Sequence, residues 1–181
     1  NNDIVRKEPD GRVIVLFKPV PAAETDARIK ELCRTYSESV KEEKRPGLLS
    51  VACFVLDFLC IHPFRDGNGR VSRLLTLLVL YQQGYRVGKY ISLERIVEET
   101  KETYYETLNT SSQSWHQDRH DIFPWVNYFL VSLLQAYGEF ERRARSFVTP
   151  RGAKTTLVRN AVKAQAGEFS LRDILAVCPS V

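Results

Sequence analysis

Methionine is absent from all 181 residues, the first position included. We therefore expect the chain to be a piece of a longer protein, a naturally processed start being the alternative. Residues 1–5 have neither the basic nor the apolar stretch of a signal peptide. No apolar run approaches the roughly 20 residues needed to cross a bilayer, and we expect no membrane partner.

Cysteine is scarce, and its spacing does not suit a metal site. The chain has four cysteines, and none of them form a C-x-x-C pair. This argues against a metal site built from thiolates and favours ordinary thiols in a reducing compartment. We therefore expect a cytoplasmic protein.

Positive charge is unevenly distributed along the chain. Residues 142–181 carry eight Lys and Arg against two Asp and Glu, whereas residues 1–141 carry 18 against 20. A basic end on a nearly neutral chain favours two functional units. We place the boundary before Pro150, with a core over residues 1–149 and a basic C-terminal segment over residues 150–181.

β-Structure is predicted in only one place. Residues 11–17 are rich in β-branched and aromatic side chains; an Asp-Gly pair marks their start, and a Lys-Pro pair follows them. This pattern predicts one strand of a hairpin that lies near residues 4–18 and turns near residues 9–11.

Helical periodicity dominates the rest of the chain. The stretch 48–61 is apolar on nearly every face, which predicts a buried central helix. In the tail, Ser170 and Asp173 are spaced as a capping box that opens a helix. The predicted fold class is all-α with a short β-hairpin. We expect helices over residues 26–40, 48–61, 69–83, 93–112, 123–147, 155–166 and from 170 onward.

One polar loop separates the two most apolar helices, and its residues suit phosphate chemistry. Gly67, Asn68 and Gly69 stand at a helix start, where backbone N–H groups and the helix dipole favour an anion. Arg70 and Arg73 lie on one face of that helix. Two cations in the first turns of a helix oppose its dipole, and a bound polyanion would offset both.

A carboxylate and an imidazole complete this set. Asp66, beside a phosphate-binding loop, is suited to Mg²⁺, which binds one or two carboxylates together with phosphate oxygens. His62 has the side chain best suited to exchange a proton near neutral pH. The residues by themselves therefore favour phosphoryl or nucleotidyl transfer. Taken singly, each has a simpler interpretation as a turn, a surface histidine or a solvated cation.

The segment from His62 to Arg73 is HPFRDGNGRVSR. It resembles the signature of the Fic family, H-x-F-x-[D/E]-G-N-G-R-x-x-R, at every defined position. The resemblance covers about residues 11–147 and implies the mainly helical Fic fold. It also implies a protein adenylyltransferase, which uses Mg²⁺ and transfers AMP from ATP to a Ser, Thr or Tyr hydroxyl of a target protein.

The resemblance assigns the proton transfer and the metal to particular residues. His62 would deprotonate the target hydroxyl, and Asp66 would hold Mg²⁺. Phe64, which we include among the nucleotide-binding residues, would pack inward and fix the loop.

The remaining residues of the motif would bind the phosphates. Gly67, Asn68 and Gly69 would cradle the α- and β-phosphates. Arg70 would hold the leaving phosphates, which is a catalytic role, and Arg73 would meet the γ-phosphate.

Two flanking segments would complete the nucleotide site. The predicted strand lies where the family has a flap, a hairpin that clamps the target chain by main-chain pairing. Tyr104 and Tyr105 resemble a Tyr-Tyr pair that contacts the adenosine in relatives. An ordinary edge strand and helix-core tyrosines are the simpler alternatives. The strand residues expected to flank the nucleotide are Ile14, Val15, Leu16 and Phe17.

Many Fic proteins carry an inhibitory helix, S/T-x-x-x-E-G/N, whose glutamate pairs with the second motif arginine, here Arg73. Residues 39–44 come closest to this pattern, but Lys44 stands where Gly or Asn is expected. They also lie between the hairpin and the motif loop, so we reject them. If the protein inhibits itself, we expect that helix to precede this chain and Arg73 to be unpaired here.

The tail resembles the start of a winged-helix module that is appended to some Fic proteins. In a longer chain such a module would favour DNA as a partner, a basic solvated tail being the alternative. Two other functions therefore stay open: a nucleotide-sensing DNA-binding regulator, and a Fic-fold transferase of phosphate or another nucleotide. A homodimer also stays open.

Overall fold

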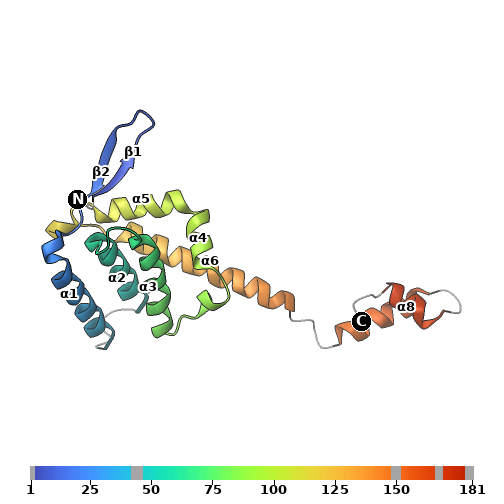
Figure 1. Ribbon diagram of the computed structural model, residues 1–181. Coiled ribbons are helices and arrows are strands. Elements are labelled where there is room, and N and C mark those ends of the chain that lie inside the picture. Colours follow the sequence, from blue (N-terminus) through green and yellow to red (C-terminus); the bar gives the residue numbers. More distant parts are fainter. Residues whose placement is uncertain (1–2, 42–46, 148–151, 166–168, 178–181) are drawn as a thin grey trace. The chain divides into compact units, whose positions relative to one another are not determined.

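The structure is a computed structural model that describes residues 3–41, 47–147, 152–165 and 169–177 (Figure 1). Within these ranges it contains eight α-helices and two β-strands, which confirms the mainly helical fold class. None of the described helices combines the length and the hydrophobicity that crossing a membrane requires. The chain forms two compact units, residues 1–140 and 141–181.

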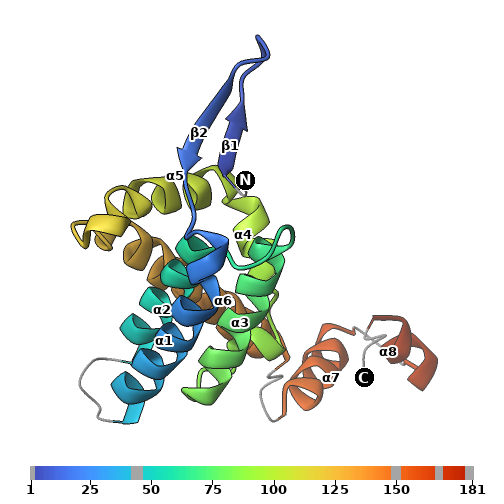
Figure 2. The ribbon, with the colours of Figure 1, turned by 60° about the vertical axis from the view of Figure 1, so that its left-hand side comes forward.

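The N-terminal hairpin is the one sheet in the described part of the chain. Strand β1 (Ile4–Lys7) pairs antiparallel with β2 (Val13–Phe17), and Val5 lies opposite Val15. Gly11 forms the turn with a φ of 85°, a conformation that glycine adopts without steric cost. The hairpin projects from the helical body of its unit (Figure 2), and its position and turn confirm the prediction.

Three helices form the body next to the hairpin. Helix α2 (Gly47–Ile61) packs against both α1 (Ala22–Lys41) and α3 (Asn68–Gln82). Ten of the 15 residues of α2 are buried, as expected for a helix that is apolar on nearly every face. After α3, the Gly84 N–H donates to the Tyr81 carbonyl, and Gly84 has a φ of 85°, the left-handed conformation in which many helices end.

The expected helix over residues 93–112 is in fact two helices, α4 (Leu93–Glu99) and α5 (Lys101–Ser112). They meet at Thr100, whose hydroxyl donates to the Ile96 carbonyl at 2.7 Å. The same hydroxyl lies 2.8 Å from the hydroxyl of Tyr128, which is 28 residues away along the chain. A threonine hydroxyl that bonds locally competes with the helical backbone, and this contact was not visible in the local periodicity.

Helix α6 (Phe123–Phe147) ties the body together. The indole Nε1 of Trp125 donates to the Ala52 carbonyl in α2 at 2.8 Å. The backbone N–H of Trp125 donates to the Ser111 hydroxyl in α5 at 3.1 Å. Two 3₁₀ turns, η1 (Val87–Lys89) and η2 (Trp115–Gln117), connect the helices.

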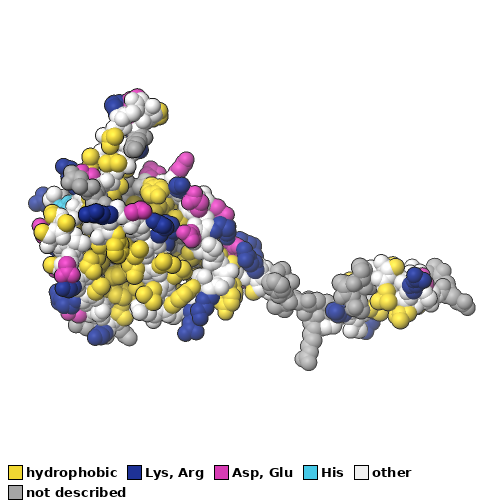
Figure 3. Space-filling model, viewed as in Figure 1, with side chains coloured by type: hydrophobic (Ala, Val, Ile, Leu, Met, Phe, Trp, Pro, Cys, Tyr) yellow, Lys and Arg dark blue, Asp and Glu magenta, His cyan; other side chains and the backbone are white. Residues whose placement is uncertain are grey.

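The face drawn in Figure 3 is not uniformly polar. Hydrophobic side chains gather over the region of α2 and α3, next to a band of charged side chains. On α3, Leu74 and Leu78 are 68% and 51% exposed.

The second unit contains α7 (Ala153–Ala164) and α8 (Leu171–Val177), which pack through Ala161 and Ile174. One carboxylate oxygen of Asp173 accepts hydrogen bonds from the N–H and the hydroxyl of Ser170, at 2.8 and 2.7 Å. This contact confirms the capping box.

Candidate active site

The motif loop is closed by a clamp from Asn68. The Asn68 side chain is buried, and its Oδ1 accepts from the Phe64 N–H at 2.9 Å while its Nδ2 donates to the Phe64 carbonyl at 2.6 Å. The amide thus satisfies both backbone groups of one residue. The Phe64 ring lies against Phe58 and is 47% exposed, which is less inward than expected. The buried Asn68 side chain therefore fixes the backbone of the loop at Phe64.

Gly67 turns the loop into α3. Its φ of 84° lies in the left-handed region, and its N–H donates to Asp66 Oδ1 at 2.7 Å. The other carboxylate oxygen of Asp66 accepts from Arg70 Nη2 at 3.0 Å. Both partners are exposed, so this ion pair stabilises the fold only slightly. It does place a carboxylate and a guanidinium together beside a helix N-terminus.

His62 follows α2 directly and has a φ of 55°. Its Nδ1 lies 3.1 Å from the Leu59 carbonyl. A carbonyl oxygen can only accept, so Nδ1 donates, and in the neutral ring the lone pair is on Nε2. Burial lowers the pKa of His62 below its ordinary 6.5, against the opposing effect of the Leu59 bond. The ring is therefore neutral at pH 7 and can accept a proton.

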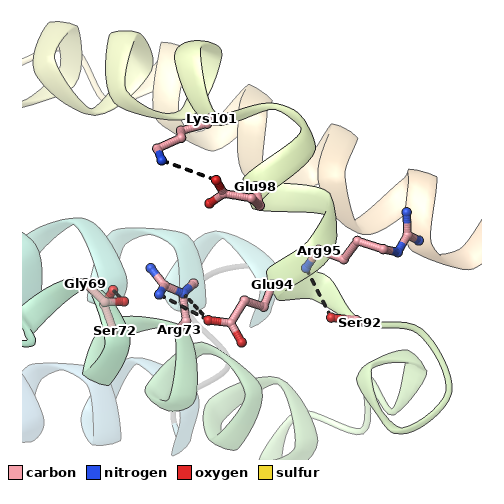
Figure 4. Close-up of polar contacts among 8 residues, drawn as sticks. All are labelled: Gly69, Ser72, Arg73, Ser92, Glu94, Arg95, Glu98 and Lys101. Atoms are coloured by element: carbon pink, nitrogen blue, oxygen red, sulfur yellow. Dashed lines mark hydrogen bonds and ion pairs between the residues drawn. The ribbon is translucent and has the colours of Figure 1, made fainter.

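Arg73 is paired, which corrects the expectation that it would be unpaired. Its Nε donates to Glu94 Oε1 at 3.1 Å, and its Nη2 forms an ion pair with the same oxygen, also at 3.1 Å (Figure 4). Glu94 stands in the first turn of α4 after the N-cap Ser92, where a negative charge also suits the helix dipole. It lies 21 residues from Arg73 along the chain. No local pattern therefore pointed to Glu94.

A cavity of about 540 Å³ joins the motif to the hairpin. His62 lines it from the end of α2, Gly69 and Arg73 from α3, and Leu16 and Phe17 from the hairpin. The cavity thus brings together an imidazole that follows α2, the start and a cation of α3, and a wall from the hairpin.

Tyr104 and Tyr105 line the same cavity from α5. Tyr104 is buried and packs edge-on against Trp125, while Tyr105 is 58% exposed. Burial raises the pKa of Tyr104 to about 12, with hydrogen bonding to Ser72 acting in the opposite direction. One tyrosine therefore belongs to the core as well as to the cavity wall, and the other is open to solvent.

Not every residue expected at the nucleotide site lines this cavity. Ile14 and Val15 are exposed on the hairpin and stand outside its lining. Asp66 and Asn68 also stand outside it. Arg70 instead lines, together with Arg73, a second and largely apolar cavity of about 270 Å³.

The residues of the motif loop could bind Mg²⁺ only if phosphate oxygens supplied further ligands. No group of three or more His, Cys, Asp or Glu side chains in the described ranges could hold a metal. Asp66 supplies one exposed carboxylate beside the helix start. Mg²⁺ commonly uses one or two carboxylates and takes its other ligands from substrate phosphates and water.

The chain is similar in sequence and in structure to known proteins. Residues 5–80 match the family model described as Fic/DOC family. A Fic family protein from Desulfovibrio desulfuricans G20 has a similar solved structure, with 25% identity and a TM-score of 0.56 over 96% of this chain and 47% of that one. A Fic domain containing signaling protein from Bacteroides thetaiotaomicron VPI-5482 is 27% identical, with a TM-score of 0.52 over 75% and 52%.

The chain therefore has a Fic-like fold. Its residues 5–80 are similar to the Fic/DOC family. The chain spans about half the length of the two solved structures that it resembles. Nothing in these similarities supports a winged-helix module in the tail, where the described residues 152–165 and 169–177 contain the helices α7 and α8.

Proposed function

We propose that this protein transfers AMP from ATP to a hydroxyl group of a protein, in a reaction that uses Mg²⁺. The observation that carries this proposal is the position of His62. A neutral imidazole with its Nδ1 held by Leu59 lines the same cavity as Gly69 and Arg73, at the start of α3. A base thus lies beside a site suited to phosphate.

In the proposed reaction, His62 Nε2 takes the proton of the acceptor hydroxyl. The hydroxyl oxygen forms a bond to the α-phosphorus of ATP, and the bond between that phosphorus and the bridging oxygen of the β-phosphate breaks. AMP stays on the acceptor and pyrophosphate leaves. The Leu59 carbonyl stabilises the imidazolium, because the Nδ1–H still donates to it after Nε2 is protonated.

The phosphates would lie over the start of α3. Its first N–H groups and dipole attract anions, and Arg70 and Arg73 would meet the leaving pyrophosphate. For this, Arg73 exchanges Glu94 for phosphate oxygens, and Arg70 exchanges Asp66. Asp66 is then available to hold Mg²⁺, which when bound neutralises phosphate charge.

The acceptor protein would dock along the hairpin. Val13 and Val15 of β2 are 56% and 44% exposed, and Val5 of β1 is 41% exposed. Apolar strand residues that face solvent, beside the cavity that holds His62, suit an extended segment added by main-chain pairing.

Labelling with α-labelled ATP and Mg²⁺ tests the proposal, with this chain and a panel of purified proteins as acceptors. His62→Ala is expected to reduce labelling by a factor of about 10² or more, because general-base catalysis typically contributes that much. Arg65→Ala is the matched control, since Arg65 lies exposed in the same loop, and it should retain labelling. Undiminished labelling by His62→Ala would contradict the role of His62.

A second transfer reaction is distinguished in the same experiment. If the label reaches protein from γ-labelled ATP and not from α-labelled ATP, the protein transfers phosphate. A mass gain of one AMP on the acceptor identifies adenylyl transfer directly.

DNA binding by a longer chain stays a prediction from the basic tail. A salt-sensitive mobility shift of duplex DNA by the longer protein, without transferase activity, would favour the regulator over the transferase.

A further inference from the structure

The base of the hairpin is held by a turn that is far away in sequence. The Phe17 ring stacks on His116, with ring centroids 5.4 Å apart and planes 6° from parallel. The Trp115 ring packs edge-on against the Phe17 ring, with ring centroids 6.4 Å apart. The His116 Nε2 lies 2.7 Å from the Lys18 carbonyl, 98 residues away along the chain, and donates to it because a carbonyl only accepts.

The turn η2, which contains Trp115 and His116, is also bonded to α2. The indole Nε1 of Trp115 donates to Asp57 Oδ1 at 2.8 Å. Asp57 lies in α2, and His62 follows the last residue of that helix. One helix thus positions both the base His62 and, through Trp115 and His116, the hairpin that forms another wall of the cavity.

The turn is also strained at both ends. Ser114 has a φ of 60° and Asp118 a φ of 54°, and these residues flank η2 on either side. A non-glycine residue is sterically disfavoured in the left-handed region, and such strain persists only where surrounding contacts impose it. The contacts of Trp115 and His116 supply that constraint.

We propose that Trp115 and His116 are positioning residues, which hold the base of the hairpin so that Phe17 closes the cavity beside His62. This inference rests on the proposed transfer, because it makes the hairpin wall part of the reacting site. The hairpin has its own strand pairing, from Val5–Val15 outward, but a two-stranded hairpin alone is only marginally stable, so loss of the anchor displaces the hairpin and lets it open more often.

Three variants separate the anchor from general stability. His116→Ala removes the ring stack and the hydrogen bond to Lys18. His116→Phe keeps a ring against Phe17 and loses only the hydrogen bond. Gln117→Ala is the matched control, because Gln117 is exposed in the same turn.

Amide hydrogen exchange, read by mass spectrometry, is measured with and without MgATP. In His116→Ala we expect exchange of residues 4–17 to rise about tenfold, because the hydrogen bond and the ring stack that hold the base of the hairpin are both lost. His116→Phe should fall between His116→Ala and the wild type, and Gln117→Ala should match the wild type. Exchange in α2 and α3 should rise less than exchange of residues 4–17.

Equal exchange of residues 4–17 in His116→Ala and Gln117→Ala would overturn the proposal. So would a rise that extends equally over α2 and α3, which would indicate a purely structural role. Positioning also predicts a change in transfer: His116→Ala should raise the KM for the acceptor protein and leave kcat within about twofold, since His62 and the phosphate loop are intact. An unchanged acceptor KM would contradict positioning.

MgATP separates this inference from the proposed function. If MgATP slows exchange over residues 62–73 in the wild type and in His116→Ala alike, the nucleotide site is intact in both. If MgATP protects nothing and no label is transferred by the wild type, the proposed function fails. The comparison of His116→Ala with Gln117→Ala then still decides whether the turn anchors the hairpin.

Discussion

The motif loop and the base of the hairpin are both walls of the candidate site, but they are held in different ways. In the loop, Asn68 bonds to Phe64 and Asp66 bonds to Arg70, each within four residues along the chain. At the hairpin base, His116 bonds to Lys18 across 98 residues, and Trp115 bonds to Asp57 across 58.

The contrast explains why the loop is recognisable and the anchor is not. A loop closed by its own residues needs fixed residue types at fixed spacing, and that requirement appears as a motif. An anchor between distant segments needs only compatible surfaces, because the tertiary fold supplies the spacing.

Among changes to the motif loop, Asn68→Ala should reduce stability the most. It leaves the Phe64 N–H and carbonyl without their partner, and we expect the free energy of unfolding to fall by about 2 kcal/mol. Urea denaturation measures this loss. Asn68→Asp keeps an acceptor for the N–H and should lose less. Equal stability of Asn68→Ala and the wild type would show that the loop does not depend on its clamp.

The pH dependence of AMP transfer tests whether His62 acts as a base with a lowered pKa. Its pKa is lowered by burial, so the neutral base persists below the ordinary 6.5 and is lost only as pH falls through the lowered value. We expect kcat/KM for ATP to be flat near pH 7 and to fall about tenfold per pH unit below that midpoint. A midpoint above 6.5 in the kcat/KM profile would contradict the effect of burial.

Two glycines in the loop should respond differently to alanine. Gly67 has a φ of 84°, so Gly67→Ala should cost about 1 kcal/mol of stability. A Cβ on Gly69 would meet Arg73 at 3.5 Å, an ordinary contact, and the backbone there is helical. Thermal unfolding of the two variants measures the difference. Equal melting temperatures would mean that backbone conformation does not distinguish these positions.

The smallest expected effect concerns the long-range pair of Arg73 and Glu94. Glu94→Gln frees Arg73 for phosphate, and we expect MgATP to bind up to about fivefold more tightly, because an exposed ion pair contributes at most about 1 kcal/mol. Calorimetric titration measures the affinity.

Glu98→Gln is the matched control for that measurement, since Glu98 lies in the same helix and pairs with Lys101 at 3.2 Å. The same affinity in both variants would show that Glu94 does not compete with the nucleotide.

Much of the fold followed from local pattern. The hairpin, the buried α2 and the capping box of α8 each depend on residues that are neighbours in the sequence. The break at Thr100 did not follow, because it involves Tyr128 on another helix. The site divides in the same way, since the motif predicted its own residues but gave no sign of Glu94.

The sequence by itself determined the helical body, the hairpin and the candidate chemistry of residues 62–73, since these depend on periodicity and on contacts within a few residues. Only the tertiary structure decided that Arg73 pairs with Glu94, and that Trp115 and His116 hold the hairpin. The physical reason is that packing of distant helices and turns sets these distances, and a contact between surface groups needs no fixed spacing in the chain.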